Sequence, residues 1–168
     1  ISDVERNIPR IKEYREHIKT CDPVGSFIND QVAIANWMYC HEDAELAKQK
    51  GAELINTFGY MAGQTVEVSE AYPANSYKAL GLLGSLRQDP NAPGDKKAAP
   101  ASGLCFGDPD TLIDTISRWE AAGADQIIFM VQAREHLPQE KVLESLRLFA
   151  KEVMPHFNQK ESTVAANA

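Results

Sequence analysis

Aromatic and polar side chains mark the ends of two apolar runs, where an α/β protein carries its chemistry. Trp37 and Tyr39 lie near the end of the run QVAIANWMYC, and Gln132 and Arg134 follow the run QIIFMV. The guanidinium group of Arg134, just after the second run, could neutralise an anionic substrate or a phosphate. Packing of the two aromatic rings in the core, and an exposed arginine paired with Glu135, are the simpler alternatives.

His41 is the one further side chain considered for acid–base chemistry. It follows the first apolar run and precedes two acidic residues, so it could titrate near neutrality. A partly exposed neighbour of an acidic helix cap is the alternative interpretation. Since the spacing shows no base or nucleophile geometry, the sequence assigns no catalytic residue.

Other common chemistries have no support in the residue pattern. The three cysteines and four histidines form no Cys-x-x-Cys or His-Glu-x-x-His motif, so we expect no metal site. The sequence also lacks a Gly-x-Ser-x-Gly elbow and a Walker motif, and GLCFGD has an incomplete dinucleotide glycine pattern. The net charge of −7 argues against nucleic acid or an anionic membrane as a partner.

The composition is that of a soluble globular domain. Of the 168 residues, 43% are hydrophobic and 24% are charged, which is enough for one core of ordinary size. No apolar run reaches the length of a membrane span, and no signal peptide is visible. The odd number of widely spaced cysteines (Cys21, Cys40 and Cys105) is typical of reduced thiols, which predicts a cytoplasmic location.

The elements that must position these residues are clearest between residues 102 and 157, where the pattern predicts strand, loop, helix, strand and helix. Asp108 is placed to cap a helix with Pro109 at its first position, and Gly123 suits the left-handed residue beyond its end. The unbroken apolar run over residues 127–131 predicts a strand buried on both faces, as in a parallel sheet.

The first half of the chain predicts a helix over residues 4–18, a buried strand within residues 27–40 and a helix over residues 41–58. Residues 59–101 follow as a connection that is uncommonly long unless it is a lid, a binding loop or disordered. Residues 158–168 lack an apolar pattern, so we expect a disordered tail.

These elements predict an α/β fold with parallel strands. About three strands are expected, which is too few to close an eight-stranded barrel. If the fold is a TIM (β/α)8 barrel, the chain is therefore its C-terminal part, with residues 59–101 as a lid-like insertion. The start at Ile1 rather than at a methionine is consistent with a fragment, a processed product or an incomplete chain.

Three motifs in this order resemble the C-terminal portion of the bacterial luciferase-like monooxygenase family. They are FGDPDTL before a helix, AAGADQIIFMV, and VLESLRLFAKEVMPHF at the end. The earlier segments YREHIKT and CHEDAELAK are similar to the family's penultimate region. The resemblance covers most of residues 1–157, which we expect to form one portion of a barrel.

The resemblance implies a flavoenzyme that uses reduced FMN (in some branches a deazaflavin) and dioxygen to oxidise a small organic substrate. It implies that residues 59–101 close over the flavin as a lid. Arg87, Lys96 and Lys97 would then be lid residues, although a solvated turn with surface side chains explains them as well. Because the family's flavin-phosphate site lies in earlier strands, the isolated chain is expected to be inactive.

Two main hypotheses follow for the function. In the first, the chain is the C-terminal portion of a flavin-dependent monooxygenase that is completed by a missing N-terminal half of the barrel or works as a homo-oligomer. In the second, it is a non-catalytic barrel remnant that oligomerises or binds a partner chain, because an unpaired sheet edge is prone to pairing. A third, an unrelated α/β domain that binds a small anion through Arg134, ranks below both.

Overall fold

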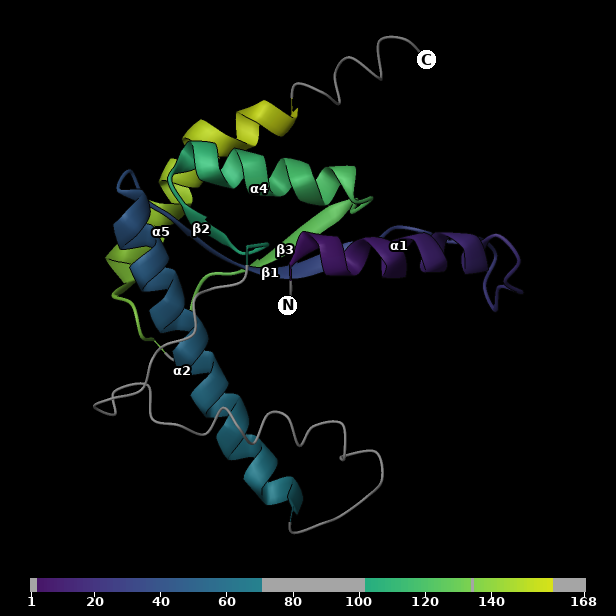
Figure 1. The fold of residues 1–168 in the computed structure, drawn as a ribbon, viewed down its shortest axis with the longest axis horizontal. Helices are drawn as coiled ribbons and strands as arrows, with labels where there is room; N and C mark the ends of the chain where they lie inside the picture. The colour runs from purple at the N-terminus through teal and green to yellow at the C-terminus, as the bar shows by residue number, and fades with distance from the viewer. Residues whose placement is uncertain (1–2, 71–101, 134, 159–168) are drawn as a thin grey trace.

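A small parallel sheet with helices packed on it forms the centre of the computed structural model (Figure 1). The structure describes residues 3–70, 102–133 and 135–158. In chain order the described elements are α1 (Val4–Ile18), β1 (Ala33–Cys40), α2 (Ala44–Glu70), β2 (Cys105–Gly107), α4 (Pro109–Ala121), β3 (Gln126–Met130), α5 (Gln139–Leu148) and the π-helical turn η2 (Phe149–Val153). The predicted α/β class with parallel strands is confirmed.

The strand β1 lies in the middle of the sheet and is hydrogen-bonded to both β2 and β3. Met38 is opposite Cys105 at the start of the β1–β2 ladder, and Trp37 is opposite Met130 at the end of the β1–β3 ladder. Since both pairings are parallel, the carboxyl ends of the three strands share one edge of the sheet, called the carboxyl edge below. The order β2-β1-β3 differs from that of a barrel, in which consecutive strands are neighbours.

The helix α4 forms as its residues predict. The carboxylate of Asp108 accepts a hydrogen bond from the backbone N–H of Thr111 at 2.9 Å, and Pro109 occupies the first helical position. Beyond the helix, Gly123 has a φ of +99°, a conformation that glycine adopts without strain. Local capping chemistry therefore fixes both ends of this helix.

The helix α2 is longer than its sequence pattern predicts. It continues past Phe58 to Glu70, so the first part of the predicted insertion is helical. Gly59 and Gly63 are buried within it. A glycine costs a helix about 1 kcal/mol relative to alanine, and close packing on a neighbour offsets such a cost. The remainder of the predicted lid-like insertion lies outside the described residues.

The core forms on both faces of β1, which is buried from Asn36 to Cys40. On one face Trp37 and Tyr39 pack with α2 and with the start of α5. On the other face Met38 and Cys40 pack with α4 and η2. The alternating side chains of one strand therefore join the helices on both sides of the sheet.

The strand β3 is not buried on both faces, so that prediction is wrong. The side chain of Ile128 is 59% exposed, and its partner across the ladder, Ala35, is exposed as well. Within the described residues, no helix covers this part of the sheet face. The apolar run was therefore a correct signal for a strand but misleading about its surroundings.

The amino ends of β1 and β3 are held together by one carboxylate. Asp125 accepts hydrogen bonds from the guanidinium of Arg15 at 2.5 Å and from the backbone N–H of Val32 at 2.6 Å. Arg15 also donates to the carbonyl of Gly123 at 3.3 Å, which ties α1 to the same corner. These polar groups therefore stabilise the edge of the sheet at which the strands begin, called the amino edge below.

None of the described helices combines the length and the apolar character that crossing a membrane requires.

Candidate functional site

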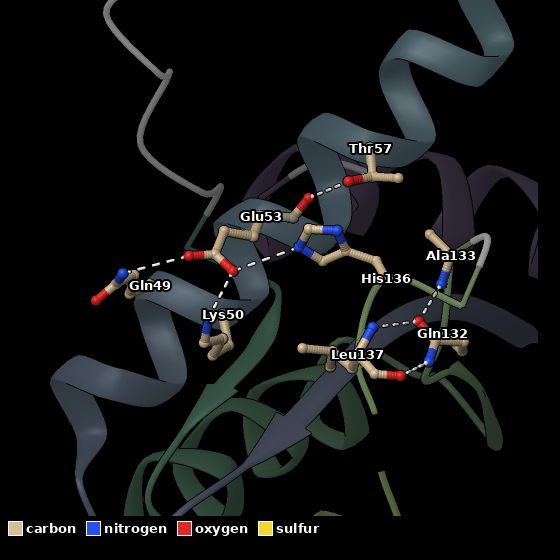
Figure 2. A network of polar contacts seen from close by, with 8 residues as sticks. All are labelled: Gln49, Lys50, Glu53, Thr57, Gln132, Ala133, His136 and Leu137. Atoms are coloured by element: carbon tan, nitrogen blue, oxygen red, sulfur yellow. Dashed lines mark hydrogen bonds and ion pairs between the residues drawn. The ribbon is translucent and has the colours of Figure 1, made fainter. Parts of the chain in front are cut away.

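Polar and titratable side chains gather at the carboxyl edge, between α2 and the loop that follows β3. Figure 2 shows Lys50 and Glu53 on α2, the ring of His136 directed at Glu53, and Gln132 beside Leu137 in the same loop. We call Lys50, Glu53, Gln132 and His136 the edge cluster. The loop over residues 131–138 joins β3 to α5, so β3 and α2 together determine where the cluster lies.

Glu53 is the centre of the edge cluster. Its Oε2 accepts from Lys50 Nζ at 2.8 Å and lies 3.4 Å from His136 Nε2, and its Oε1 accepts from Gln49 Nε2 at 3.2 Å. The side chain is 19% exposed. Partial burial alone would raise the pKa of Glu53, but the hydrogen bonds from Lys50 and His136 outweigh it and hold the pKa below its ordinary value. Glu53 is therefore ionised at neutral pH.

Gln132 fixes the conformation of the loop. Its Oε1 accepts from the backbone N–H groups of Ala133 and Leu137 at 3.0 and 3.2 Å, and its Nε2 donates to the carbonyl of Leu137 at 2.7 Å. Glu135 has a φ of +53°, a left-handed conformation that a non-glycine residue adopts at some cost. Gln132 thus lies at the predicted edge, where these contacts place His136. Its predicted contact with a substrate stays a prediction.

Tyr39 lies beneath the edge cluster at the end of β1. Its ring is buried and stacked on His41, with centroids 6.5 Å apart and planes inclined by 6°. Burial raises the pKa of the Tyr39 hydroxyl, which also feels the charges of Lys141 and Glu144 on α5. Trp37 lies deeper, with its ring 5.2 Å from that of Phe58. Both aromatic residues are core residues, as the simpler alternative predicted.

His41 lies in the turn between β1 and α2. Its Nδ1 accepts a hydrogen bond from the backbone N–H of Asp43 at 2.9 Å. The carboxylate of Asp43 in turn caps the helix by accepting from the backbone N–H groups of Glu45 and Leu46 at 3.0 and 3.1 Å. The structure therefore places His41 as the neighbour of an acidic cap, the alternative that the sequence left open.

The remaining predicted site residues cannot be placed. Arg87, Lys96, Lys97 and Arg134 lie outside the described residues. In the part of the chain that the structure describes, no three or more histidine, cysteine, aspartate or glutamate side chains gather as metal ligands would. Gln132 is thus the predicted site residue that belongs to the edge cluster.

Two of the three helix starts at the carboxyl edge, those of α2 and α4, do not fit the phosphate of FMN, whereas the start of α5 after Pro138 has no side-chain cap. A phosphate binds well at a helix start because free backbone N–H groups point at it. At α2 and α4 the carboxylates of Asp43 and Asp108 already accept from those groups. A phosphate there would compete with a negative charge, so neither helix start offers a phosphate site.

Sequence reasoning missed Lys50, Glu53 and His136. Lys50 and Glu53 are three residues apart on a helix, a spacing that signals only an ordinary surface pair. His136 lies 83 positions beyond Glu53 in the sequence, so only the packing of the loop on α2 brings them together. The one available signal was that His136 follows a predicted strand end.

Comparison with known proteins gives a similarity among solved structures. No protein family matches the chain, and no curated protein does. Among solved structures, the chain is similar to the crystal structure of the monooxygenase RslO1 from Streptomyces bottropensis, with a TM-score of 0.51 and 18% sequence identity. The similarity covers 94% of this chain and 40% of RslO1, so the chain spans less than half the length of that protein. At this identity the likeness concerns the fold alone.

Proposed function

We propose that this chain is the C-terminal portion of a flavin-dependent, luciferase-like monooxygenase that oxidises a small organic substrate with reduced flavin and dioxygen. The single observation that carries the proposal is the structural likeness to the monooxygenase RslO1 over 94% of the chain. The motifs FGDPDTL and AAGADQIIFMV, which form the start of α4 and the strand β3, support it independently.

In this proposal the chain is part of a TIM barrel, so the order β2-β1-β3 and the helices on both sheet faces would have to change to the barrel arrangement in the longer protein. The exposed side chain of Ile128 on β3 supports it, because a strand within a closed barrel has packed neighbours on both faces. The 40% coverage of RslO1 agrees with a chain that supplies fewer than half of the strands. Further strands would then pair beside β3, and side chains from the rest of the barrel would cover its exposed face.

The flavin phosphate is bound by another part of the protein in this proposal. The acidic caps of α2 and α4 favour this division, because they occupy the amides that would otherwise hold a phosphate. The described residues contribute the carboxyl edge, where polar side chains can contact a substrate. FMN, or a deazaflavin in its place, would supply the redox chemistry.

The test uses the longest natural polypeptide that contains this sequence. It is mixed with reduced FMN, a panel of small organic compounds and 18O-labelled dioxygen, and the products are analysed by mass spectrometry. A monooxygenase places one labelled oxygen atom in the product, whereas the same reaction with labelled water and ordinary dioxygen gives none. Failure of reduced FMN and of a reduced deazaflavin to support any turnover would contradict the proposal.

A second candidate function is a non-catalytic module that oligomerises through its sheet. The exposed pair Ile128 and Ala35 favours it, since apolar side chains on an open sheet are sites of association. Sedimentation velocity of the 168-residue chain separates the two candidates. A dimer that an Ile128→Lys substitution dissociates would favour the module, and a folded monomer would count against it.

A further inference from the structure

His136 and Glu53 form a pair that the proposed function leaves without a role. We propose that His136 is a catalytic residue that accepts a proton from the substrate, and that Glu53 is the positioning residue that orients its ring. This inference rests on the proposed function, because it assigns a task within that reaction. It also implies a substrate class, a compound that carries an acidic O–H or N–H group.

The place of the pair in the fold is the first argument. His136 belongs to the loop that follows β3, and Glu53 belongs to the helix that follows β1 (Figure 2). Both elements leave the sheet at its carboxyl edge, where α/β proteins bind their ligands. The side chain of His136 is 32% exposed, so a substrate can reach its ring.

The charge of Glu53 decides which ring nitrogen carries the proton. Glu53 is ionised at neutral pH, and an ionised carboxylate only accepts hydrogen bonds. The nitrogen that faces it at 3.4 Å, Nε2, must therefore be the N–H of the neutral ring. In that tautomer Nδ1 of His136 carries a lone pair, and the ring's hydrogen bond among the described residues is the one at Nε2. The pair thus presents an unoccupied proton acceptor at the carboxyl edge.

The loop holds this acceptor in a defined place. The backbone N–H of His136 donates to the carbonyl of Ala133 at 3.0 Å. Gln132 binds both polar backbone groups of Leu137, the next residue. A base that is fixed in this way loses little conformational entropy when the substrate binds.

The proton transfer has a simple balance. The O–H or N–H bond of the substrate breaks, its electron pair stays on the substrate atom, and a new N–H bond forms at Nδ1. The ring becomes an imidazolium beside the Glu53 carboxylate, which stabilises the new positive charge. Lys50 Nζ lies 2.8 Å from the same carboxylate oxygen and balances its charge before the transfer.

The titratable groups around the pair come from several elements. Lys50 on α2 is bonded to Glu53, Glu135 precedes His136 in the loop, and Tyr39 on β1 feels the charges of Lys50 and Glu53 and of Lys141 and Glu144 on α5. Lys141 and Glu144 are paired with each other at 2.7 Å. Among these groups, Glu53 is the carboxylate bonded directly to His136. Glu53 therefore has the strongest influence on the ring.

The experiment uses the longest natural polypeptide with reduced FMN, dioxygen and a compound from the panel that carries an acidic O–H or N–H group. The kcat for this compound is measured in wild type and in the H136A, H136Q, E53Q and E45Q variants. We expect H136A to reduce kcat about 100-fold, which is the lower end for removal of a general base. Added imidazole should restore part of the kcat of H136A but not of H136Q, whose side chain fills the space. E45Q is the matched control, because Glu45 makes an exposed pair with Lys48 on the same helix at 2.8 Å.

The role of Glu53 has a readout that a structural role would not change. In 15N-histidine-labelled protein, NMR should show the Nε2–H form of His136 in wild type and in E45Q. E53Q should contain a mixture of both tautomers and should lose less kcat than H136A. An E53Q spectrum identical to that of wild type would overturn the positioning role.

The two proposals fail in different ways. If wild-type protein shows no turnover with reduced flavin, the proposed function fails and the role of His136 fails with it. If wild type turns over and H136A equals it, the proposed function stands and the role of His136 is overturned. A loss in H136A that imidazole does not restore would show that the ring only packs, and it too would overturn the role.

Discussion

At the scale of single residues, burial separates the three thiols. Burial raises the pKa of Cys40 to about 11 and that of Cys105 to about 12, whereas Cys21 is exposed. Since the thiolate is the reactive form, the two buried thiols have almost none of it at pH 8. We therefore expect iodoacetamide to label Cys21 in the folded protein and all three thiols in denaturant. Mass spectrometry of tryptic peptides measures this, and equal labelling of Cys105 without denaturant would contradict the fold.

The cap of α4 gives a prediction about stability and pH. Asp108→Ala removes the hydrogen bond to Thr111 and should lower the free energy of unfolding by about 1 kcal/mol at pH 7. Hydrogen bonds from Thr111 lower the pKa of Asp108 below its ordinary value of 3.8. Because the pKa is lower in the folded state, the contribution of the Asp108 carboxylate to stability is fully present above pH 3.8. It is lost as the pH falls through the pKa of the folded state. The difference between wild type and Asp108→Ala should therefore shrink below pH 4.

Urea unfolding at pH 7, 5 and 3 measures this difference. Asp108→Asn is the control, because an amide oxygen keeps the cap but does not titrate. A difference between wild type and Asp108→Ala that grows as the pH falls would contradict the assigned cause.

At the scale of elements, the contact between α2 and β2 depends on one glycine. A Cβ built at Gly51 would collide with the ring of Phe106, whereas at Gly25 nothing lies within 4 Å. We expect Gly51→Ala to destabilise the protein by about 1–3 kcal/mol, since overpacking a core costs this much. Gly25→Ala, the control, should change the free energy of unfolding by less than about 0.5 kcal/mol. Thermal unfolding followed by circular dichroism measures both, and equal effects would contradict the packing of α2 on β2.

The elements differ in how far their residues predict them. The helix α4 was predictable to its ends, because Asp108, Pro109 and Gly123 determine them through local contacts. The end of α2 was not, because the buried environment of Gly59 and Gly63 comes from packing that no local pattern records. The pairing of Glu53 with His136 was unpredictable for the same reason. The sequence therefore predicts structure that depends on neighbouring residues, but not contacts between segments that are far apart in the chain.

At the scale of the whole molecule, the exposed face of β3 separates this chain from the longer protein that we propose. Ile128 is 59% exposed here, so Ile128→Thr should change the stability of the 168-residue chain by less than about 0.5 kcal/mol. In the longest natural polypeptide the same substitution should cost about 1–3 kcal/mol, because further strands would bury the side chain. Chemical unfolding of both pairs of proteins measures this. If Ile128→Thr lowers the free energy of unfolding equally in both proteins, the proposal that the chain is part of a barrel is contradicted.

In the proposed function, ligands bind at the carboxyl edge of this sheet. Hydrogen–deuterium exchange of the longest natural polypeptide, with and without a turned-over substrate and FMN, tests it most directly. We predict slower exchange in the loop over residues 131–138, which carries His136, and no change at the amino edge around Val32 and Asp125. Protection confined to the amino edge, or unchanged exchange in the loop at saturating ligand, would contradict the account.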